Sequence, residues 1–278
     1  MMLPEDFFDL KECDHQELFQ SDAPVWTALD RLQEYLASFF KTSRPLASHV
    51  GMVEKPLIII NDAVRDDLDV RPAGPKNTIQ AFDGDRPLEE AAIIMPGAYL
   101  FDDKIIIGAG TVVEPGALIK GPTVIGFKTE IRQGAYMRGN CLIGNRCIVG
   151  HTTEIKNSIM LDESKAGHFA YIGDSILGKN VNLGAGTKLA NLKMIPGTIM
   201  IVVNRKYHKT GRRKLGAILG DRTETGCNSV TSPGTLMGPG SIVYSGVPIP
   251  AGYYKKGSFV MQSRDSIVIG SNLFVESK

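Results

Sequence analysis

An apolar residue recurs at every sixth position over a long stretch of this chain, and this period constrains the fold more than any other feature. A period of six matches neither the 3.6 residues of a helical turn nor the seven of a coiled coil. A glycine often follows the apolar residue, as at Gly108, Gly126, Gly144 and Gly150, and glycine marks positions that need an unusual φ or have no room for a Cβ. The row runs through Met95, Phe101, Ile107, Val113, Ile119, Ile125, Ile131, Met137, Ile143, Val149, Ile155 and Leu161.

Short strands joined by tight corners satisfy this period. If three six-residue sides close one coil, residues eighteen apart stack about 4.8 Å from each other, which is the spacing of neighbouring strands. The apolar row then fills the interior of a three-sided prism. We therefore predict a mainly β fold, a parallel β-helix of hexapeptide repeats, over residues 91–250.

Two further parts flank the predicted β-helix. Residues 1–90 form an N-terminal helix and an irregular lead-in that contains strands, and residues 251–278 form a C-terminal tail. Inside the β-helix, residues 192–214 interrupt the six-residue rhythm, and we expect a loop or hairpin to leave the prism there. In the N-terminal helix, Asp22 and Pro24 can serve as cap and first-turn residue, and the helical spacing gives an apolar stripe of Val25, Leu29, Leu32, Leu36 and Phe39.

Charge and cysteine content exclude several classes of protein. Thirty-one Lys and Arg against 30 Asp and Glu give a formal net charge of +1, so general attraction to nucleic acid is excluded as the main function. The acidic N-terminus lacks the pattern of a signal peptide, and no run of about 18 apolar residues occurs. We therefore expect a soluble, cytoplasmic protein with no membrane partner. No zinc-type pair occurs among the four cysteines, which are Cys13, Cys141, Cys147 and Cys227. We expect them to be reduced thiols that are buried or half-buried.

Stacking at eighteen residues places three cations, Lys120, Arg138 and Lys156, in one column on successive coils. Like charges about 5 Å apart repel by roughly 0.8 kcal/mol in water. An anion held between them would reverse that cost. A phosphate site is one interpretation of the column, and a solvated basic edge is the other.

The interruption at 192–214 is a second basic feature. It contains no acidic residue and has a formal charge of +7 from Lys193, Arg205, Lys206, Lys209, Arg212, Arg213 and Lys214. Its aromatic content is Tyr207 alone, whereas single-stranded nucleic acid is bound on several interleaved aromatic rings. A small phosphorylated ligand therefore fits better than nucleic acid, and a flexible basic surface loop is the alternative.

Two adjacent motifs are far more specific than the repeat. Residues 165–174 read K-A-G-H-x-x-Y-x-G-D, and residues 180–187 read N-x-N-x-G-A-G-T. With this spacing the chain resembles, over roughly residues 95–191 and 214–248, the acetyltransferase half of the bifunctional N-acetylglucosamine-1-phosphate uridyltransferase/glucosamine-1-phosphate acetyltransferase. The segment G-R-R-K-L-G-A at 211–217 is also similar to archaeal sugar-phosphate thymidylyltransferase-like chains. The resemblance implies a left-handed β-helix and a homotrimer whose sites lie in clefts between chains.

The same resemblance implies roles for particular residues. His168 corresponds to the general base that takes the proton of the sugar amine, and imidazole is suited to this task near neutral pH. Tyr171 and Asn191 match the other catalytic residues. The residues that match the sugar-phosphate contacts are Arg138, Lys156, Asn182 and Lys214. The residues that match the family's contacts with the co-substrate, acetyl-coenzyme A, lie on later coils: Ala185, Cys227 (in place of a family serine) and Ser245. No metal is expected to take part.

The chain departs from that family at the substrate end of the site. Leu192 stands where the family has a tyrosine, and the insertion follows it. No Gly-rich nucleotidyl-transfer segment or P-loop occurs, so uridyl transfer is not expected.

Three functions are compared on this basis. The first is an acetyl-coenzyme A-dependent N-acetyltransferase that acts on an amino-sugar phosphate. The second is a non-catalytic or regulatory trimer that binds a sugar phosphate or sugar nucleotide. The third, a metal-dependent enzyme of the carbonic anhydrase kind, requires three convergent histidines, and only His151 and His168 lie on the regular coils.

Overall fold

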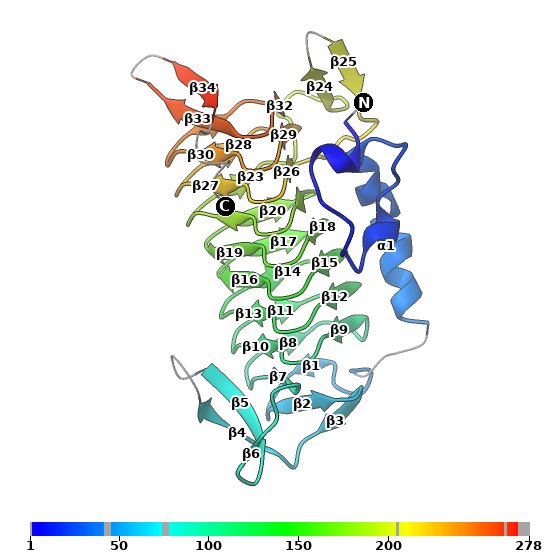
Figure 1. Cartoon of the computed structure of the whole chain (residues 1–278). Coiled ribbons are helices and arrows are strands. Elements are labelled where there is room, and N and C mark those ends of the chain that lie inside the picture. The colour runs from blue at the N-terminus through cyan, green and yellow to red at the C-terminus, as the bar shows by residue number, and fades with distance from the viewer. Residues whose placement is uncertain (1, 42–45, 74–77, 204–205, 264–265, 272–278) are drawn as a thin grey trace.

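The computed structural model describes residues 2–41, 46–73, 78–203, 206–263 and 266–271. Three long sheets wrap around a common interior and give the molecule the form of an elongated prism (Figure 1). We call these sheets face 1, face 2 and face 3.

Each face is built from one strand of every coil. Face 1 consists of β1 (Gly51–Met52), β8 (Tyr99–Leu100), β11 (Leu118–Ile119), β14 (Tyr136–Met137), β17 (Glu154–Lys156), β20 (Tyr171–Gly173), β23 (Lys188–Leu189), β28 (Val230–Thr231) and β31 (Pro248–Ile249). Face 2 consists of β3 (Ala63–Arg65), β2 (Leu57–Ile60), β7 (Ala92–Ile94), β10 (Val112–Val113), β13 (Glu130–Ile131), β16 (Ile148–His151), β19 (Lys165–His168), β22 (Asn182–Leu183), β27 (Glu224–Thr225), β30 (Ile242–Val243), β33 (Ser258–Gln262) and β34 (Ile267–Ser271). Face 3 consists of β32 (Gly252–Tyr254), β29 (Thr235–Met237), β26 (Ala217–Leu219), β21 (Ile176–Leu177), β18 (Ser158–Met160), β15 (Cys141–Ile143), β12 (Thr123–Ile125) and β9 (Ile105–Ile107).

Neighbouring coils run parallel, and their register confirms the stacking expected from the repeat. Val112 pairs with Glu130 and Glu130 pairs with Ile148, eighteen residues further on each time. Beyond that point the coil is shorter by one residue, because Ile148 pairs with Lys165 and Lys165 pairs with Asn182. The mainly β, parallel β-helix predicted from the period of six is therefore confirmed.

The inward side chains form the main core and match the predicted row from Ile107 to Ile155. The prediction is wrong at the two ends of that row. Ile94 and Leu100 point inward, whereas Phe101 is 53% exposed. The shortened coil brings Met160 into the interior and turns Leu161 outward. A slip of one residue along a strand moves a side chain to the opposite face, which is why a strict period of six fails at these places.

The N-terminal segment covers the outer side of face 3. It consists of the short 3-10 helices η1 (Pro4–Asp6), η2 (Gln16–Leu18) and η3 (Val25–Thr27), followed by α1 (Ala28–Phe39), which lies along face 3 in Figure 1. The predicted helix is present, but Pro24 precedes η3 without a side-chain cap, so Asp22 is not its cap. Within the described residues, none of the helices is long and apolar enough to cross a membrane.

A second apolar core joins this segment to the β-helix. It contains Phe7, Trp26, Leu29, Leu32 and Leu36 from the segment and the outward residues Val124, Leu142, Ile159, Ile176, Ile218 and Leu236 of face 3. Full burial of one large apolar side chain stabilises a fold by about 1.5–3 kcal/mol. The segment is therefore held firmly on face 3, and that face is not open to solvent or to a ligand where the segment covers it.

Additional strands close both ends of the prism. At the first coil, β1 and β2 pair antiparallel with β8 and β7, and a small sheet of β4 (Asp69–Ala73), β5 (Thr78–Asp83) and β6 (Arg86–Pro87) extends from there. At the other end, β32 and β33 still pair in parallel with β29 and β30. Because Tyr254 and Val260 keep the inward pattern, the β-helix continues to Gln262 and does not stop at the expected boundary of 250. β34 then turns back antiparallel on β33.

The interruption of the repeat is a β-hairpin. β24 (Met200–Val203) pairs antiparallel with β25 (Lys206–Lys209), and Leu192 bridges to Lys214 at the base of the insertion. The coil resumes in register beyond it, since Asn182 pairs with Glu224. Arg205 lies outside the described residues. The expectation that a loop or hairpin leaves the prism here agrees with the structure.

Two of the four cysteines lie inside the prism. Burial raises the pKa of Cys141 to about 12 and that of Cys147 to about 11. Both thiols are therefore protonated at neutral pH and are poor nucleophiles. Cys13 is half-buried, whereas the side chain of Cys227 is exposed, contrary to expectation.

His15 connects η2 to α1. Its Nδ1 lies 2.8 Å from the hydroxyl oxygen of Tyr35, and the rings of Tyr35 and Phe39 pack edge-on against it. Burial lowers the pKa of His15 below its usual 6.5, and the neighbouring Asp14 opposes this effect. The docked segment therefore favours the neutral imidazole.

We predict that acid weakens the docking of the N-terminal segment through His15. A pKa that is lower in the folded state means that the unfolded state binds the proton first, so stability is lost as the pH falls below about 6.5. Denaturant unfolding of the wild type and of His15→Gln at pH 7.5 and pH 5.0 measures this contribution. The wild type should lose more free energy of unfolding than the variant, and equal losses would contradict the prediction.

Candidate functional site

Four candidate residues lie along one edge of the prism, the corner where face 2 turns into face 1. His168, Ala185, Cys227 and Ser245 occupy the same corner position on successive coils, each two residues beyond an inward-facing residue of face 2. Backbone hydrogen bonds connect the coils there: the N–H groups of Gly186, Asn228 and Gly246 donate to the carbonyls of His168, Ala185 and Cys227 at 3.0, 2.8 and 2.7 Å. The expected base and the expected coenzyme A contacts thus form one continuous line.

His168 is exposed at the end of β19. The next residue, Phe169, has a φ of 52°, and Thr152 and Asn228 have φ values of 53° and 57° at the same corner of other coils. The left-handed conformation therefore belongs to the corner of the coil. Phe169 is itself exposed and packs edge-on against His151 at 5.2 Å. Within the part of the chain that the structure describes, the His168 ring has no hydrogen-bonding partner, so it is free to meet a ligand.

Tyr171 and Asn191 meet on face 1 and the corner that follows it. The Tyr171 hydroxyl donates a hydrogen bond to Oδ1 of Asn191 over 3.3 Å. Both side chains lie over Gly173, where an added Cβ would be 2.7 Å from Tyr171 Oη and 2.7 Å from Asn191 Nδ2. A glycine at this position is therefore required for the contact between the tyrosine and the asparagine.

Asp174 is the buried centre of this group, and the sequence interpretation gave it no role. Its carboxylate accepts hydrogen bonds from Lys156 Nζ at 2.8 Å, from Asn157 Nδ2 at 2.7 Å and from Asn191 Nδ2. The side chains of Lys156 and Asp174 are 17% and 6% exposed. Asp174 is the last residue of the motif that contains His168. Its place in that motif could have identified it as a candidate site residue from the sequence alone.

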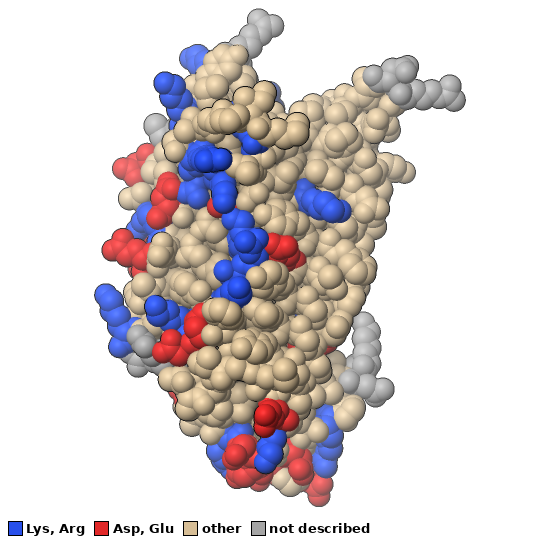
Figure 2. All heavy atoms as spheres, turned by 180° about the vertical axis from the view of Figure 1, so that it is seen from behind, with Lys and Arg blue, Asp and Glu red and all other residues tan. Residues whose placement is uncertain are grey.

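The predicted basic column is present, but carboxylates of the chain accompany it. Figure 2 shows a narrow stripe of Lys and Arg that climbs this side of the molecule toward the end bearing the hairpin, with acidic residues beside it. Arg138 pairs with Glu154 at 2.7 Å, and this hydrogen bond raises the pKa of Arg138. The Lys120 ammonium lies 4.5 Å from the centre of the Phe101 ring. Arg138 and Lys156 are thus each paired with a carboxylate of the chain, whereas Lys120 lies over an aromatic ring.

The insertion contributes one cation to the cluster, and it is not the one expected. Arg212 Nη2 lies 4.0 Å from Asp174 Oδ1, and Nη1 pairs with Asp30 of α1. The expected residue, Lys214, is exposed at the base of the insertion, where its carbonyl accepts a hydrogen bond from Arg212 Nε over 3.2 Å.

The candidate residues therefore form two groups on one chain. Arg138, Lys156 and Tyr171 lie on face 1, and Asn191 and Lys214 lie near its edge with face 3. His168 and Asn182 lie on face 2. Within the described residues, no group of three or more His, Cys, Asp or Glu side chains is placed to hold a metal ion.

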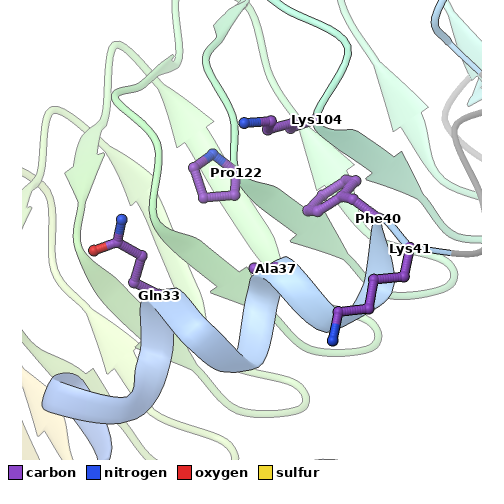
Figure 3. A pocket seen from close by; sticks show the side chains of 6 residues that line it. All are labelled: Gln33, Ala37, Phe40, Lys41, Lys104 and Pro122. Atoms are coloured by element: carbon purple, nitrogen blue, oxygen red, sulfur yellow. The ribbon is translucent and has the colours of Figure 1, made fainter.

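A hollow of about 630 Å³ lies elsewhere, between α1 and the first coils (Figure 3). It is lined by Gln33, Ala37, Phe40 and Lys41 from the helix and its end and by Lys104 and Pro122 from the prism. None of the candidate residues lines it.

Comparisons with known proteins agree with this architecture. Residues 119–230 match the family model of the GMPPB C-terminal domain. The bifunctional sugar-1-phosphate nucleotidylyltransferase/acetyltransferase of Sulfurisphaera tokodaii is 38% identical over 36% of this chain and 25% of its own length. The bifunctional protein GlmU of Methanococcus maripaludis is 40% identical over 50% of this chain and 34% of its own length. The chain thus spans about a quarter to a third of these relatives.

Solved structures with a related fold include an acyltransferase. The UDP-N-acetylglucosamine acyltransferase of Francisella novicida superposes with a TM-score of 0.50 at 14% identity and covers 64% of each chain. The class defined by fold and motifs is the left-handed β-helix of hexapeptide repeats. Within that class, the resemblance to the C-terminal half of the bifunctional uridyltransferase/acetyltransferase is confirmed.

We predict that the two ion pairs of the column contribute very differently to stability. Asp174→Asn leaves a largely buried ammonium without its counter-ion and should lower the free energy of unfolding by about 3 kcal/mol. Glu154→Gln, the matched change at the exposed pair with Arg138, should stay within about 0.5 kcal/mol. Denaturant unfolding of both variants compares them, and similar losses would show that the Asp174 cluster is not a buried network.

Proposed function

We propose that this protein is an acyltransferase that moves an acetyl group from acetyl-coenzyme A to the amine of an amino-sugar phosphate similar to glucosamine 1-phosphate. The observation that carries the proposal is the alignment of His168 with Ala185, Cys227 and Ser245 along one corner, in a chain whose relatives include named acetyltransferases. Acyl transfer to an amine requires a general base beside the site that binds the acyl donor, here acetyl-coenzyme A.

The chemistry assigns each group a step. The amine nitrogen attacks the thioester carbonyl carbon, a C–N bond forms, and the C–S bond breaks as coenzyme A leaves as a thiol. His168 takes the proton that the amine loses and is suited to return a proton to the departing sulfur. Holding both substrates side by side supplies much of the rate increase.

The basic group on face 1 holds the sugar phosphate in this proposal. Arg138, Lys156 and Lys214 supply positive charge for the phosphate, while Asn182 and Asn191 orient the sugar and its amine. Arg138 is well suited because its guanidinium is exposed and can exchange Glu154 for a phosphate, which it binds in a bidentate manner. Lys156 is held by Asp174 and therefore presents a fixed rather than a mobile ammonium.

We propose further that the protein is a homotrimer. The candidate residues are divided between face 1 and face 2, and a cleft between two copies would bring the two groups together. Face 3 is covered by the N-terminal segment of its own chain, so the uncovered faces remain for a closed cyclic assembly. Light scattering should return three times the monomer mass of 30.2 kDa.

A second candidate is a non-catalytic trimer that binds a sugar phosphate or sugar nucleotide. Its support is that Leu192 is exposed where the related acetyltransferases have a tyrosine and that the hairpin rises beside the substrate end of the site. Kinetic measurement separates this candidate from the enzyme.

We predict thiol release from acetyl-coenzyme A in the presence of glucosamine 1-phosphate and a loss of about 10²- to 10⁴-fold in kcat for His168→Ala, the usual contribution of a general base. His151→Ala is the matched control, because His151 occupies the same corner one coil earlier, and it should retain the wild-type rate. If neither protein releases thiol with any amino-sugar phosphate or amino-sugar nucleotide, the non-catalytic candidate is favoured.

We also predict that Arg138→Ala weakens the binding of glucosamine 1-phosphate by roughly 10- to 150-fold, since a charged hydrogen bond is worth about 1.5–3 kcal/mol. The affinity for acetyl-coenzyme A should hardly change. Arg146→Ala, which removes a similar exposed arginine paired with Glu163, is the control in calorimetric titration. Unchanged sugar-phosphate affinity would refute the phosphate assignment, and a loss confined to acetyl-coenzyme A would mean that the two sites are exchanged.

A further inference from the structure

Opposite charges in this chain are concentrated in two distant segments that meet in the fold. Residues 1–40 contain nine acidic and two basic residues, a formal charge of −7, and residues 192–214 carry +7. In the structure, Ile199 and Ile201 of the insertion belong to the same apolar core as Trp26 and Leu29 of the N-terminal segment. The ion pair between Asp30 and Arg212 joins the two segments across 182 positions of sequence.

Arg212 lies between two carboxylates and is largely buried, with 13% of its side chain exposed. One guanidinium nitrogen pairs with Asp30 on α1, another lies 4.0 Å from Asp174 Oδ1, and Nε donates to the carbonyl of Lys214. At 4.0 Å the contact with Asp174 is electrostatic and too long for a hydrogen bond. Asp30 therefore holds the guanidinium just short of the buried carboxylate.

The hydrogen-bonding capacity of Asp174 explains why this restraint matters. Its Oδ2 accepts from Lys156 and Asn191, and its Oδ1 accepts from Asn157. If Arg212 lost Asp30, its strongest remaining partner would be Asp174, which an arginine binds through two parallel hydrogen bonds. Closer approach of Arg212 would compete with Asn157 for Oδ1. A bidentate pair would also engage Oδ2 and displace Lys156 and Asn191 from their present positions.

We propose that Asp30 is a positioning residue for the sugar-phosphate site: by restraining Arg212, it sets where Lys156 and Asn191 lie around Asp174. This inference rests on the proposed function for the identity of the substrate. It gives the N-terminal helix a function in the site in addition to its packing on face 3.

The kinetic test compares Asp30→Asn with Glu34→Gln, which removes the same charge from an exposed position one turn further along α1. Because the Asp30 side chain is 53% exposed, its ion pair should contribute up to about 1 kcal/mol. Asp30→Asn should therefore raise the KM for glucosamine 1-phosphate about two- to five-fold and leave the KM for acetyl-coenzyme A unchanged. Asp30→Glu should restore the wild-type value. Arg212→Gln combined with Asp30→Asn should be no worse than Arg212→Gln alone, because Asp30 acts through Arg212.

A second measurement does not depend on catalysis. The N–H of Leu215 donates to the Asn191 carbonyl at 3.0 Å, and that of Gly216 donates to the Asp174 carbonyl at 2.8 Å. Hydrogen exchange at these amides should be faster in Asp30→Asn than in Glu34→Gln and in the wild type. If the wild type acetylates no sugar phosphate, the proposed function fails and hydrogen exchange alone decides the positioning role.

Two results would overturn the proposal. The first is that Asp30→Asn and Glu34→Gln have the same hydrogen-exchange rates at these amides and the same KM for the sugar phosphate. The other is a lower melting temperature with equal changes in the KM of both substrates, which would show that the pair with Arg212 only fastens the N-terminal segment.

Discussion

Backbone hydrogen bonding between successive coils is the constraint on which the rest of this structure depends. It places each residue above the residue 17 or 18 positions earlier, so that side chains of the same kind form columns along the interior, the faces and the corners. The interior column of apolar residues stabilises the prism. In the column of cations on face 1, Glu154 pairs with Arg138 and Asp174 pairs with Lys156, which reduces the repulsion between the cations.

The one-residue shortening of the coil after Ile148 explains the chemistry of the candidate site. With an eighteen-residue coil, Lys156 would be followed in its column by Asp174; with the shorter coil, Lys156 pairs with Gly173 instead. Gly173 leaves space for Tyr171 and Asn191, and Asp174 falls at the corner, where its carboxylate reaches Lys156 and both asparagines. Shortening the coil thus moves Asp174 from the column on face 1 to the corner, where it becomes the buried centre of a hydrogen-bonded cluster.

The N-terminal segment and the hairpin modify a prism that is otherwise built from repeats. The segment covers face 3 with apolar side chains, and the root of the hairpin joins the same core through Ile199 and Ile201. Both additions therefore meet at the end of the prism where the Asp174 cluster lies. Arg212 of the insertion connects the three parts, since it pairs with Asp30 of the N-terminal segment and lies 4.0 Å from Asp174 of the prism.

The sequence by itself determined the period of six, and with it the prism, its interior row from Ile107 to Ile155 and the column that contains Arg138 and Lys156. These features depend on local spacing, which is visible in a single chain. The tertiary structure alone decided the shifts at Phe101 and Leu161, the pairing of Arg138 and Lys156 with carboxylates, and the contact between Asp30 and Arg212. Such contacts depend on which coil loses a residue and on how distant segments pack, and neither property leaves a periodic signal in the sequence.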